Sequence, residues 1–168
     1  MLEVLDETKL LGTVITSDLK WDKNTDNLVK NANKRMKMLH VAAKFVTNNQ
    51  DLVYLYKTFI RSILEFSAVV WHSSLSQANT SDIERIQKSA VKIILKHKYK
   101  DYDSALKELN LETLQKRREI LCLRFAKKSL KLNNFKKMFP LSKKLHSMKQ
   151  SKKEKSFYKN MPILKKYF

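Results

Sequence analysis

The chain has 168 residues, of which 35 are Lys or Arg and 16 are Asp or Glu, so its formal net charge is +19. A single Gly and two Pro exclude glycine-rich phosphate loops, β-sandwiches and doubly wound sheets, all of which need more turn-forming residues. The lone Cys122 excludes an internal disulfide and a cysteine cluster for zinc, and no apolar run has the length of a membrane span. This composition predicts a mainly helical, intracellular protein of the nucleus or cytoplasm, whose favoured partner is a polyanion and not a membrane.

Residues 1–17 hold seven aliphatic side chains grouped around the polar stretch Asp6–Thr8, a pattern that predicts two short strands joined by a turn there. A two-stranded ribbon is marginally stable by itself, so we expect it to pack on the following helices or on the sheet of a larger parent protein. A chain that opens directly in an apolar strand favours truncation of such a parent. Residues 1–26 carry a net charge of −3, which leaves +22 for the remainder.

From Asn27 the apolar residues recur every three or four positions, which predicts an amphipathic helix. Its predicted inner face consists of Leu28, Ala32, Met36, Leu39, Ala43 and Val46. Thr47 and Gln50 have the spacing of a capping box and open a second predicted helix. This segment is apolar on both sides as far as Trp71, with Phe59 and Phe66 on one of them, so we expect it to be the central buried element of a bundle.

Another capping box, Ser81 with Glu84, predicts the start of a third helix. Its predicted inner face includes Ile83, Ile86, Ala90, Ile93 and Ile94, and its lysines Lys88, Lys92 and Lys96 recur every four residues on another face. A short helix near residues 104–109 precedes a longer one from about Thr113. The longer helix has a second predicted basic face, formed by Arg117, Arg124, Lys128 and Lys131.

The C-terminal part changes composition, because residues 136–168 contain eleven lysines and one acid, Glu154. Such a segment is typical of a basic tail that is poorly ordered in isolation. The sequence therefore predicts a hairpin over residues 1–20, a helical domain over residues 21–134 and a basic tail over residues 135–168.

Few residues suggest catalysis or metal binding. The pair Asp101 and Asp103 has the carboxylates that bind Mg²⁺ in polymerases, but lysines precede it and a helix follows, so we interpret Asp103 as a helix N-cap. Four histidines, at positions 40, 72, 97 and 146, lack metal-ligand spacing, and a nucleophilic pair of one of them with Cys122 has the least support. We predict no catalytic, cofactor-binding or metal-binding residue in this chain.

The basic helix faces are the stronger functional signal. Lysines on an outward face are often only a solvated surface, but +22 over residues 27–168 favours many simultaneous phosphate contacts. The predicted contacts to a nucleic-acid backbone are Lys88, Lys92, Lys96, Arg117, Arg124, Lys128 and Lys131. The alternative is a helical protein–protein interaction or scaffold module, whose charge serves solubility or an acidic partner.

Several strings occur in a characteristic order and spacing. They are residues 9–12 (KLLG), 17–21 (SDLKW), 31–35 (NANKR), 56–65 (YKTFIRSILE), 70–72 (VWH), 83–88 (IERIQK) and 109–114 (LNLETL), followed by Arg117 and Arg118. Together they resemble the end of the polymerase domain in non-LTR (LINE-type, jockey-like) retrotransposon reverse transcriptases. Residues 138–141 (MFPL) and 161–164 (MPIL) resemble the C-terminus of that family, so the resemblance covers nearly the whole chain. Ser62 departs from the family, which often has Pro there.

The resemblance implies that Leu11 and Gly12 belong to the primer-grip hairpin, and that the helices form the thumb, which binds the template–primer backbone. In this family the catalytic carboxylates and the endonuclease domain lie upstream, and no position here matches them. The implied function is a fragment that supports RNA-directed DNA polymerase activity without being an enzyme on its own. Its implied partners are an RNA template, a DNA primer and the missing polymerase domain, and only that parent enzyme would use Mg²⁺.

Overall fold

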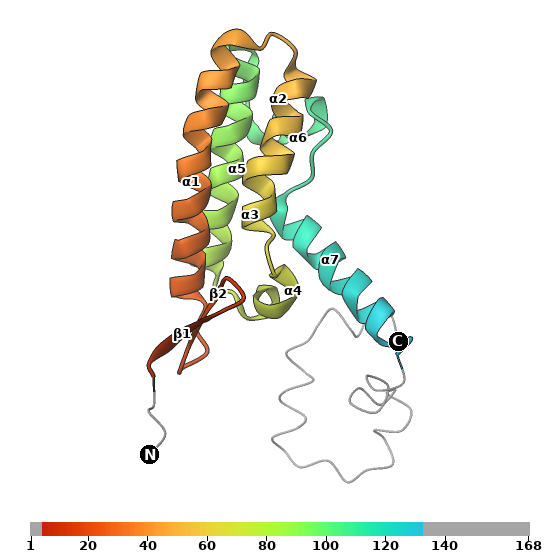
Figure 1. Cartoon of the computed structure of the whole chain (residues 1–168). Coiled ribbons are helices and arrows are strands. Elements are labelled where there is room, and N and C mark those ends of the chain that lie inside the picture. The colour runs from red at the N-terminus through yellow and green to blue at the C-terminus, as the bar shows by residue number, and fades with distance from the viewer. Residues whose placement is uncertain (1–4, 133–168) are drawn as a thin grey trace. The chain divides into compact units, whose positions relative to one another are not determined.

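The computed structural model describes residues 5–132. The chain divides into two compact units, residues 1–118 and residues 119–168. The first unit is a helical bundle preceded by an antiparallel β-hairpin, which confirms the predicted mainly helical fold (Figure 1). The basic tail predicted over residues 135–168 lies outside the described residues.

The hairpin consists of β1 (Glu7–Leu10) and β2 (Thr13–Thr16), with Leu10 opposite Thr13. The two residues between the strands, Leu11 and Gly12, both have positive φ, at 46° and 89°. This is the pattern of a type I′ turn, whose twist matches that of the strands. The turn predicted around Asp6–Thr8 is therefore wrong. Gly, which adopts positive φ without strain, fixes the turn more strongly than a run of polar residues does.

Helix α1 (Asp22–Phe45) buries Leu28, Ala32, Met36, Leu39 and Ala43, so its predicted inner face is confirmed at these positions. The helix begins at Asp22, five residues before the predicted start at Asn27. The residues buried in its first turn, Asn24 and Thr25, are polar and so do not belong to the apolar pattern used for the prediction. The Asn24 carboxamide oxygen accepts a hydrogen bond from the backbone N–H of Val14 at 3.1 Å. This contact fastens β2 to the first turn of α1.

The second helical segment is interrupted. It comprises α2 (Asn49–Leu55), a π-helical stretch η1 (Tyr56–Arg61), and α3 (Ser62–Leu64), and it is capped by Asn48 rather than by the predicted Thr47. The i→i+5 hydrogen bonds of a π helix shift the faces of the residues around it. Accordingly Phe59 and Phe66, which the apolar pattern predicts to be buried, are 41% and 46% exposed.

The segment between the second and third predicted helices forms its own short elements. Ser67 adopts a left-handed conformation with φ of 51° and separates α3 from α4 (Ala68–Trp71), which is followed by η2 (His72–Ser74). Trp71 is fully buried, and its indole N–H donates to the carbonyl of Phe66 at 3.0 Å. The predicted continuous helix as far as Trp71 is therefore wrong.

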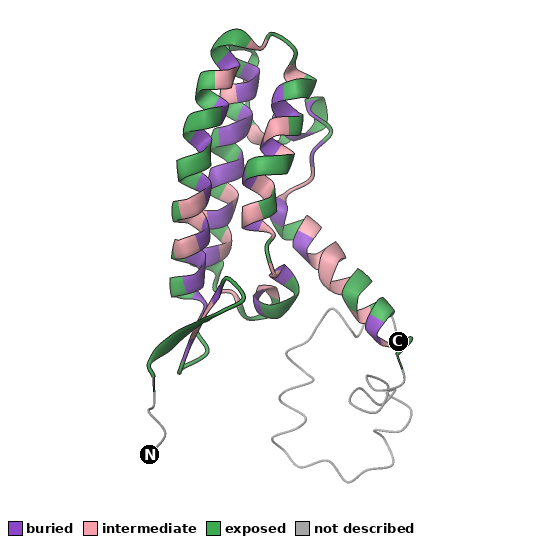
Figure 2. Cartoon of the chain, in the orientation of Figure 1, coloured by how far each residue is buried: buried purple, intermediate pink, exposed green. Residues whose placement is uncertain are grey.

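Helix α5 (Gln77–Leu95) packs against α1, α2 and α6 and buries eight residues (Figure 2). The second predicted helix, which we expected to be the central buried element, buries only five residues over α2, η1 and α3. The predicted inner residues of α5, Ile83, Ile86, Ala90 and Ile94, are buried, and Ile93 is half-buried. The helix begins earlier than the predicted box of Ser81 and Glu84, because the Ser76 hydroxyl accepts a hydrogen bond from the N–H of Asn79 at 3.1 Å.

Glu84 has a different role from the predicted one. Its carboxylate accepts hydrogen bonds from the backbone N–H groups of Leu114 and Gln115, at 3.2 and 3.3 Å, and so caps the start of α7 (Leu114–Ser129). Between α5 and α7 lie η3 (Lys96–Lys98) and α6 (Tyr102–Glu108). The cap of α6 is Asp101, which accepts from the N–H of Ser104, so the assignment of Asp103 as the N-cap is also wrong.

A buried polar network joins these helices through Gln87, whose side chain is fully enclosed. Its amide oxygen accepts from the Tyr56 hydroxyl at 2.6 Å, and its amide nitrogen donates to the Tyr102 hydroxyl at 2.8 Å and the Glu112 carbonyl at 2.9 Å. The Tyr102 hydroxyl in turn donates to Glu84. Burial and this carboxylate raise the pKa of Tyr102, so the phenol stays protonated and remains a donor.

We predict that Gln87→Leu lowers the free energy of unfolding by about 2–3 kcal/mol, because the Tyr56 hydroxyl and the Glu112 carbonyl lose their buried partner. Urea denaturation followed by circular dichroism measures the change. The control Ser89→Ala removes a hydroxyl from an exposed position of the same helix and is expected to have little effect. Equal stability of Gln87→Leu and the wild type would contradict a structural role for the network.

Candidate nucleic-acid interface

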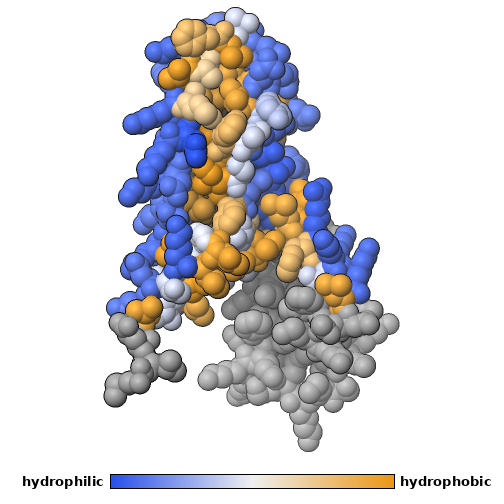
Figure 3. Space-filling view, in the orientation of Figure 1, coloured by the Kyte–Doolittle hydropathy of each residue, from blue (hydrophilic) through white to orange (hydrophobic). Residues whose placement is uncertain are grey.

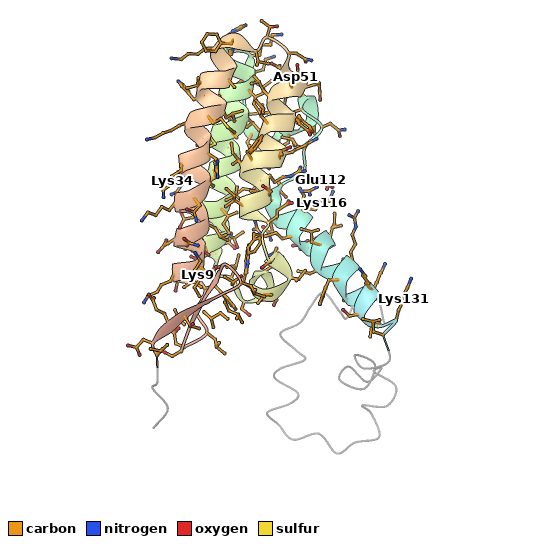
Figure 4. The ribbon with its side chains drawn as sticks, in the orientation of Figure 1. Lys9, Lys34, Asp51, Glu112, Lys116 and Lys131 are labelled. Carbon is orange, nitrogen blue, oxygen red and sulfur yellow. The ribbon has the colours of Figure 1, made fainter. Side chains whose placement is uncertain are left out.

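An open groove of about 670 Å³ lies where the hairpin turn, α1 and α3 meet, and we call it the hairpin groove. Its polar lining is Lys9, Asn27, Asn31, Lys34, Arg35 and Ser62, and its apolar lining is Leu28, Ile63 and Phe66, with Gly12 at the turn. In Figure 4, Lys9 and Lys34 mark two of the elements that border it, the hairpin and α1. Three segments that are far apart in sequence therefore contribute to one surface.

Local contacts hold the walls of the groove in place. The Lys23 ammonium lies 2.6 Å from the Glu7 carboxylate, which ties β1 to the first turn of α1. At the turn, a Cβ added to Gly12 would lie 3.1 Å from an edge carbon of the Phe66 ring. Gly12 thus serves two purposes: it permits the positive φ, and it lets the turn approach the aromatic ring closely.

The groove is cationic. Lys9, Lys34 and Arg35 are all exposed, and none of them forms an ion pair with a residue in the range 5–132. Among the described residues, 5–132, the lining contains no carboxylate. Three cations facing an open groove without a counter-charge attract an anion, and a phosphodiester backbone supplies several at regular intervals.

The basic face predicted for α5 is present. Lys88, Lys92 and Lys96 are exposed, and two of them lie over aromatic rings. The Lys88 ammonium is 5.2 Å from the centre of the Tyr102 ring, and that of Lys92 is 5.3 Å from the centre of the Tyr99 ring. Such cation–π contacts restrict the lysine side chains while their charge remains in solvent. Their binding to phosphate stays a prediction.

Arg117 has a structural role that the sequence did not reveal. Its guanidinium donates two hydrogen bonds to the Glu65 carboxylate, at 2.5 and 3.0 Å, and the Glu65 side chain is only 13% exposed. The hydrogen bond to Glu65 raises the pKa of Arg117. We therefore remove Arg117 from the phosphate contacts, because its departure would leave the nearly buried Glu65 carboxylate with only the longer ion pair to Arg61, at 3.9 Å. Arg124, Lys128 and Lys131 of the second unit are exposed, as predicted.

Wherever the structure describes them, the residues considered for metal binding or nucleophilic chemistry do not converge on a metal site. Within residues 5–132, no group of three or more His, Cys, Asp or Glu side chains is placed to hold a metal ion. Cys122 is half-buried in α7, and the carboxylate of Asp101 is engaged as a helix cap, which lowers its pKa. His146 lies outside the described residues.

None of the helices that the structure describes is both long enough and apolar enough for a bilayer crossing. No protein-family model, curated protein or solved structure matches the chain.

Sequence reasoning missed Lys9, Lys34 and Arg35 as a cluster. A signal was present, because residues 9–12 and 31–35 both belong to the strings that resemble reverse transcriptases. The positions Asn27, Asn31 and Lys34 also follow helical spacing on one face of α1. The sequence did not indicate that Ile63 and Phe66 line the groove, because the π helix before them, η1, changes the helical periodicity.

Leu11 offers a test of the hairpin turn. This residue is 88% exposed and has a left-handed backbone, a conformation that Asn adopts more readily than Leu. We expect Leu11→Asn to raise the free energy of unfolding by about 0.5–1 kcal/mol, measured by chemical denaturation. The matched control Leu10→Asn replaces an exposed leucine within β1, where Asn is disfavoured, and is not expected to stabilise the protein.

Proposed function

We propose that the chain is a thumb-like nucleic-acid-binding module of a non-LTR retrotransposon reverse transcriptase. It holds the RNA template and the DNA primer for RNA-directed DNA synthesis and performs no catalysis of its own. The family assignment rests on the sequence strings that resemble such enzymes. The binding assignment rests on one observation, the cluster of Lys9, Lys34 and Arg35 in a groove beside the turn formed by Leu11 and Gly12.

The chemistry of the groove favours a phosphate backbone over individual bases as the feature recognised. Its cations stand on two separate elements, β1 and α1, and so can contact successive phosphates of one strand. Contacts of this kind fix the position of a duplex without reading its sequence. A polymerase that copies any template needs that property, and Lys88, Lys92 and Lys96 add a second set of contacts.

The hairpin supports a partnership with a larger polymerase. Strand β1 is exposed along its whole length, and Leu5 and Leu10 are 58% and 59% exposed. An exposed strand edge with apolar side chains is normally paired or covered. The proposed cover is the upstream polymerase domain, whose sheet would continue from β1.

The second candidate function is a helical protein–protein interaction or scaffold module. The observation that favours it is the exposure of large apolar side chains on the bundle, including Phe45 at 80%. Competition separates the two functions. Polyphosphate should displace the ligand of a nucleic-acid-binding module, whereas an acidic protein should displace that of a scaffold.

We predict that changing Lys9, Lys34 and Arg35 together to Glu weakens binding to an RNA–DNA hybrid by tenfold or more at low salt. The variant should also flatten the dependence of log Kd on log salt by roughly one for each phosphate that the protein no longer binds. Fluorescence anisotropy with a labelled hybrid measures both quantities on the full chain.

The matched control changes Lys30, Lys37 and Lys44 to Glu. These exposed lysines stand on α1 at seven-residue spacing, so the control has the same charge change on a different face of the same helix. An equal loss of affinity in both variants would show that only the overall field matters and would contradict the groove as the contact site.

A separate prediction concerns α5. Replacing Lys88, Lys92 and Lys96 with Glu should weaken hybrid binding across unrelated sequences to a similar extent, because phosphate contacts carry no sequence information. A filter-binding titration with several hybrid sequences measures this. Unchanged affinity would remove these three lysines from the interface.

A further inference from the structure

An apolar strip continues from the hairpin groove along α1. The groove positions Asn27, Asn31 and Lys34 are followed, at the same spacing of three and four residues, by Met38, Val41 and Phe45. All three apolar side chains are exposed, by 36%, 54% and 80%. They stand apart from the core face of α1, which consists of the positions 28, 32, 36, 39 and 43. Helix α1 therefore has a second apolar face that the bundle does not cover.

The neighbouring helical segment adds an aromatic ring. Helix α1 packs against η1 and α3, and the two segments run in opposite directions (Figure 1). Phe59 of η1 stands four residues before Ile63, which lines the groove, and its side chain is 41% exposed. Figure 3 shows a column of apolar side chains along this part of the bundle, with hydrophilic side chains on both sides. The strip thus begins at the cations and extends away from them.

The combination of charge and apolar surface narrows the choice of ligand. A duplex presents phosphates to a protein but keeps the faces of its bases stacked inside, so it would use the groove and leave the strip uncovered. An unpaired strand presents phosphates together with the planar apolar faces of its bases, which stack on aromatic side chains. From Lys34 to Phe45 the strip extends about 16 Å along α1, enough for several contacts with one strand.

We propose that Met38, Val41, Phe45 and Phe59 form a stacking surface for the unpaired bases of a single strand whose phosphates lie in the hairpin groove. This inference rests on the proposed function and deepens it: where a bound strand is unpaired, its bases contact the strip, and its phosphates occupy the groove that also binds the backbone of a hybrid. Recognition by stacking is tolerant of sequence, because every base has an aromatic face.

The experiment compares two single strands of equal length and equal charge. One is a thymidine oligonucleotide, and the other has abasic sites at the same positions and so retains the phosphates without the bases. Anisotropy titrations of the full chain should show at least about fivefold tighter binding of the thymidine strand, which is the gain expected from one stacked base.

Variants assign the effect to the strip. Phe45→Leu with Phe59→Leu keeps apolar side chains and removes the aromatic faces, so the preference for the thymidine strand should fall towards one. Binding of the abasic strand and of an RNA–DNA hybrid should remain unchanged. The matched control Phe125→Leu replaces a phenylalanine of the second unit that is 51% exposed, and it should keep the full preference.

The outcomes are distinguishable. Equal affinity of the wild type for both strands would overturn the stacking surface and leave the proposed function intact, whereas no binding to either strand or to the hybrid would overturn both. A preference that survives in the double variant would overturn the assignment to these residues. Sedimentation of the free chain as a dimer that the double variant converts to a monomer would assign the strip to a second copy of the chain and overturn the proposal.

Discussion

The hydrogen bonds of the buried Gln87 side chain constrain how the helices of the first unit pack together. They fix Tyr56 at the start of the π helix on one side, and Tyr102 and the chain segment before α7 on the other. Because a buried amide without partners is costly, alternative packings of α5 against these segments are disfavoured. The same arrangement sets where Phe59 emerges on the surface and brings Tyr102 beneath Lys88.

A second constraint on the structure is the large excess of basic residues, because their charged side chains cannot be buried in the helical core. Arg117 is the informative exception, since the nearly buried Glu65 carboxylate holds it through two hydrogen bonds. The exposed lysines and arginines, by contrast, are distributed over distinct faces, and the hairpin groove gathers three cations, with no carboxylate from the described part of the chain. A ligand with many negative charges therefore meets a structured surface rather than a uniformly charged one.

The hairpin is attached to the helical bundle and contributes one of the cations of the groove. Asn24 and Lys23 fasten it to the start of α1, and Gly12 allows its turn to lie close to the Phe66 ring. Without this attachment Lys9 would not stand beside Lys34 and Arg35. A groove with cations at one end and an apolar strip leading away from it suits a strand whose phosphates and bases contact different residues, as proposed for single-stranded nucleic acid.

The sequence by itself determined the helical class and the inner faces of α1 and α5, because burial imposes a period on residues that are neighbours along one helix. It also predicted an N-terminal hairpin but misplaced the turn. It did not determine the helix starts, where adjacent residues such as Thr47 and Asn48 compete to cap the same helix. Only the tertiary structure decided that Arg117 pairs with Glu65, and that Lys9 joins Lys34 and Arg35 in one groove. These contacts join residues far apart in the chain, and their geometry depends on packing angles that no local pattern encodes.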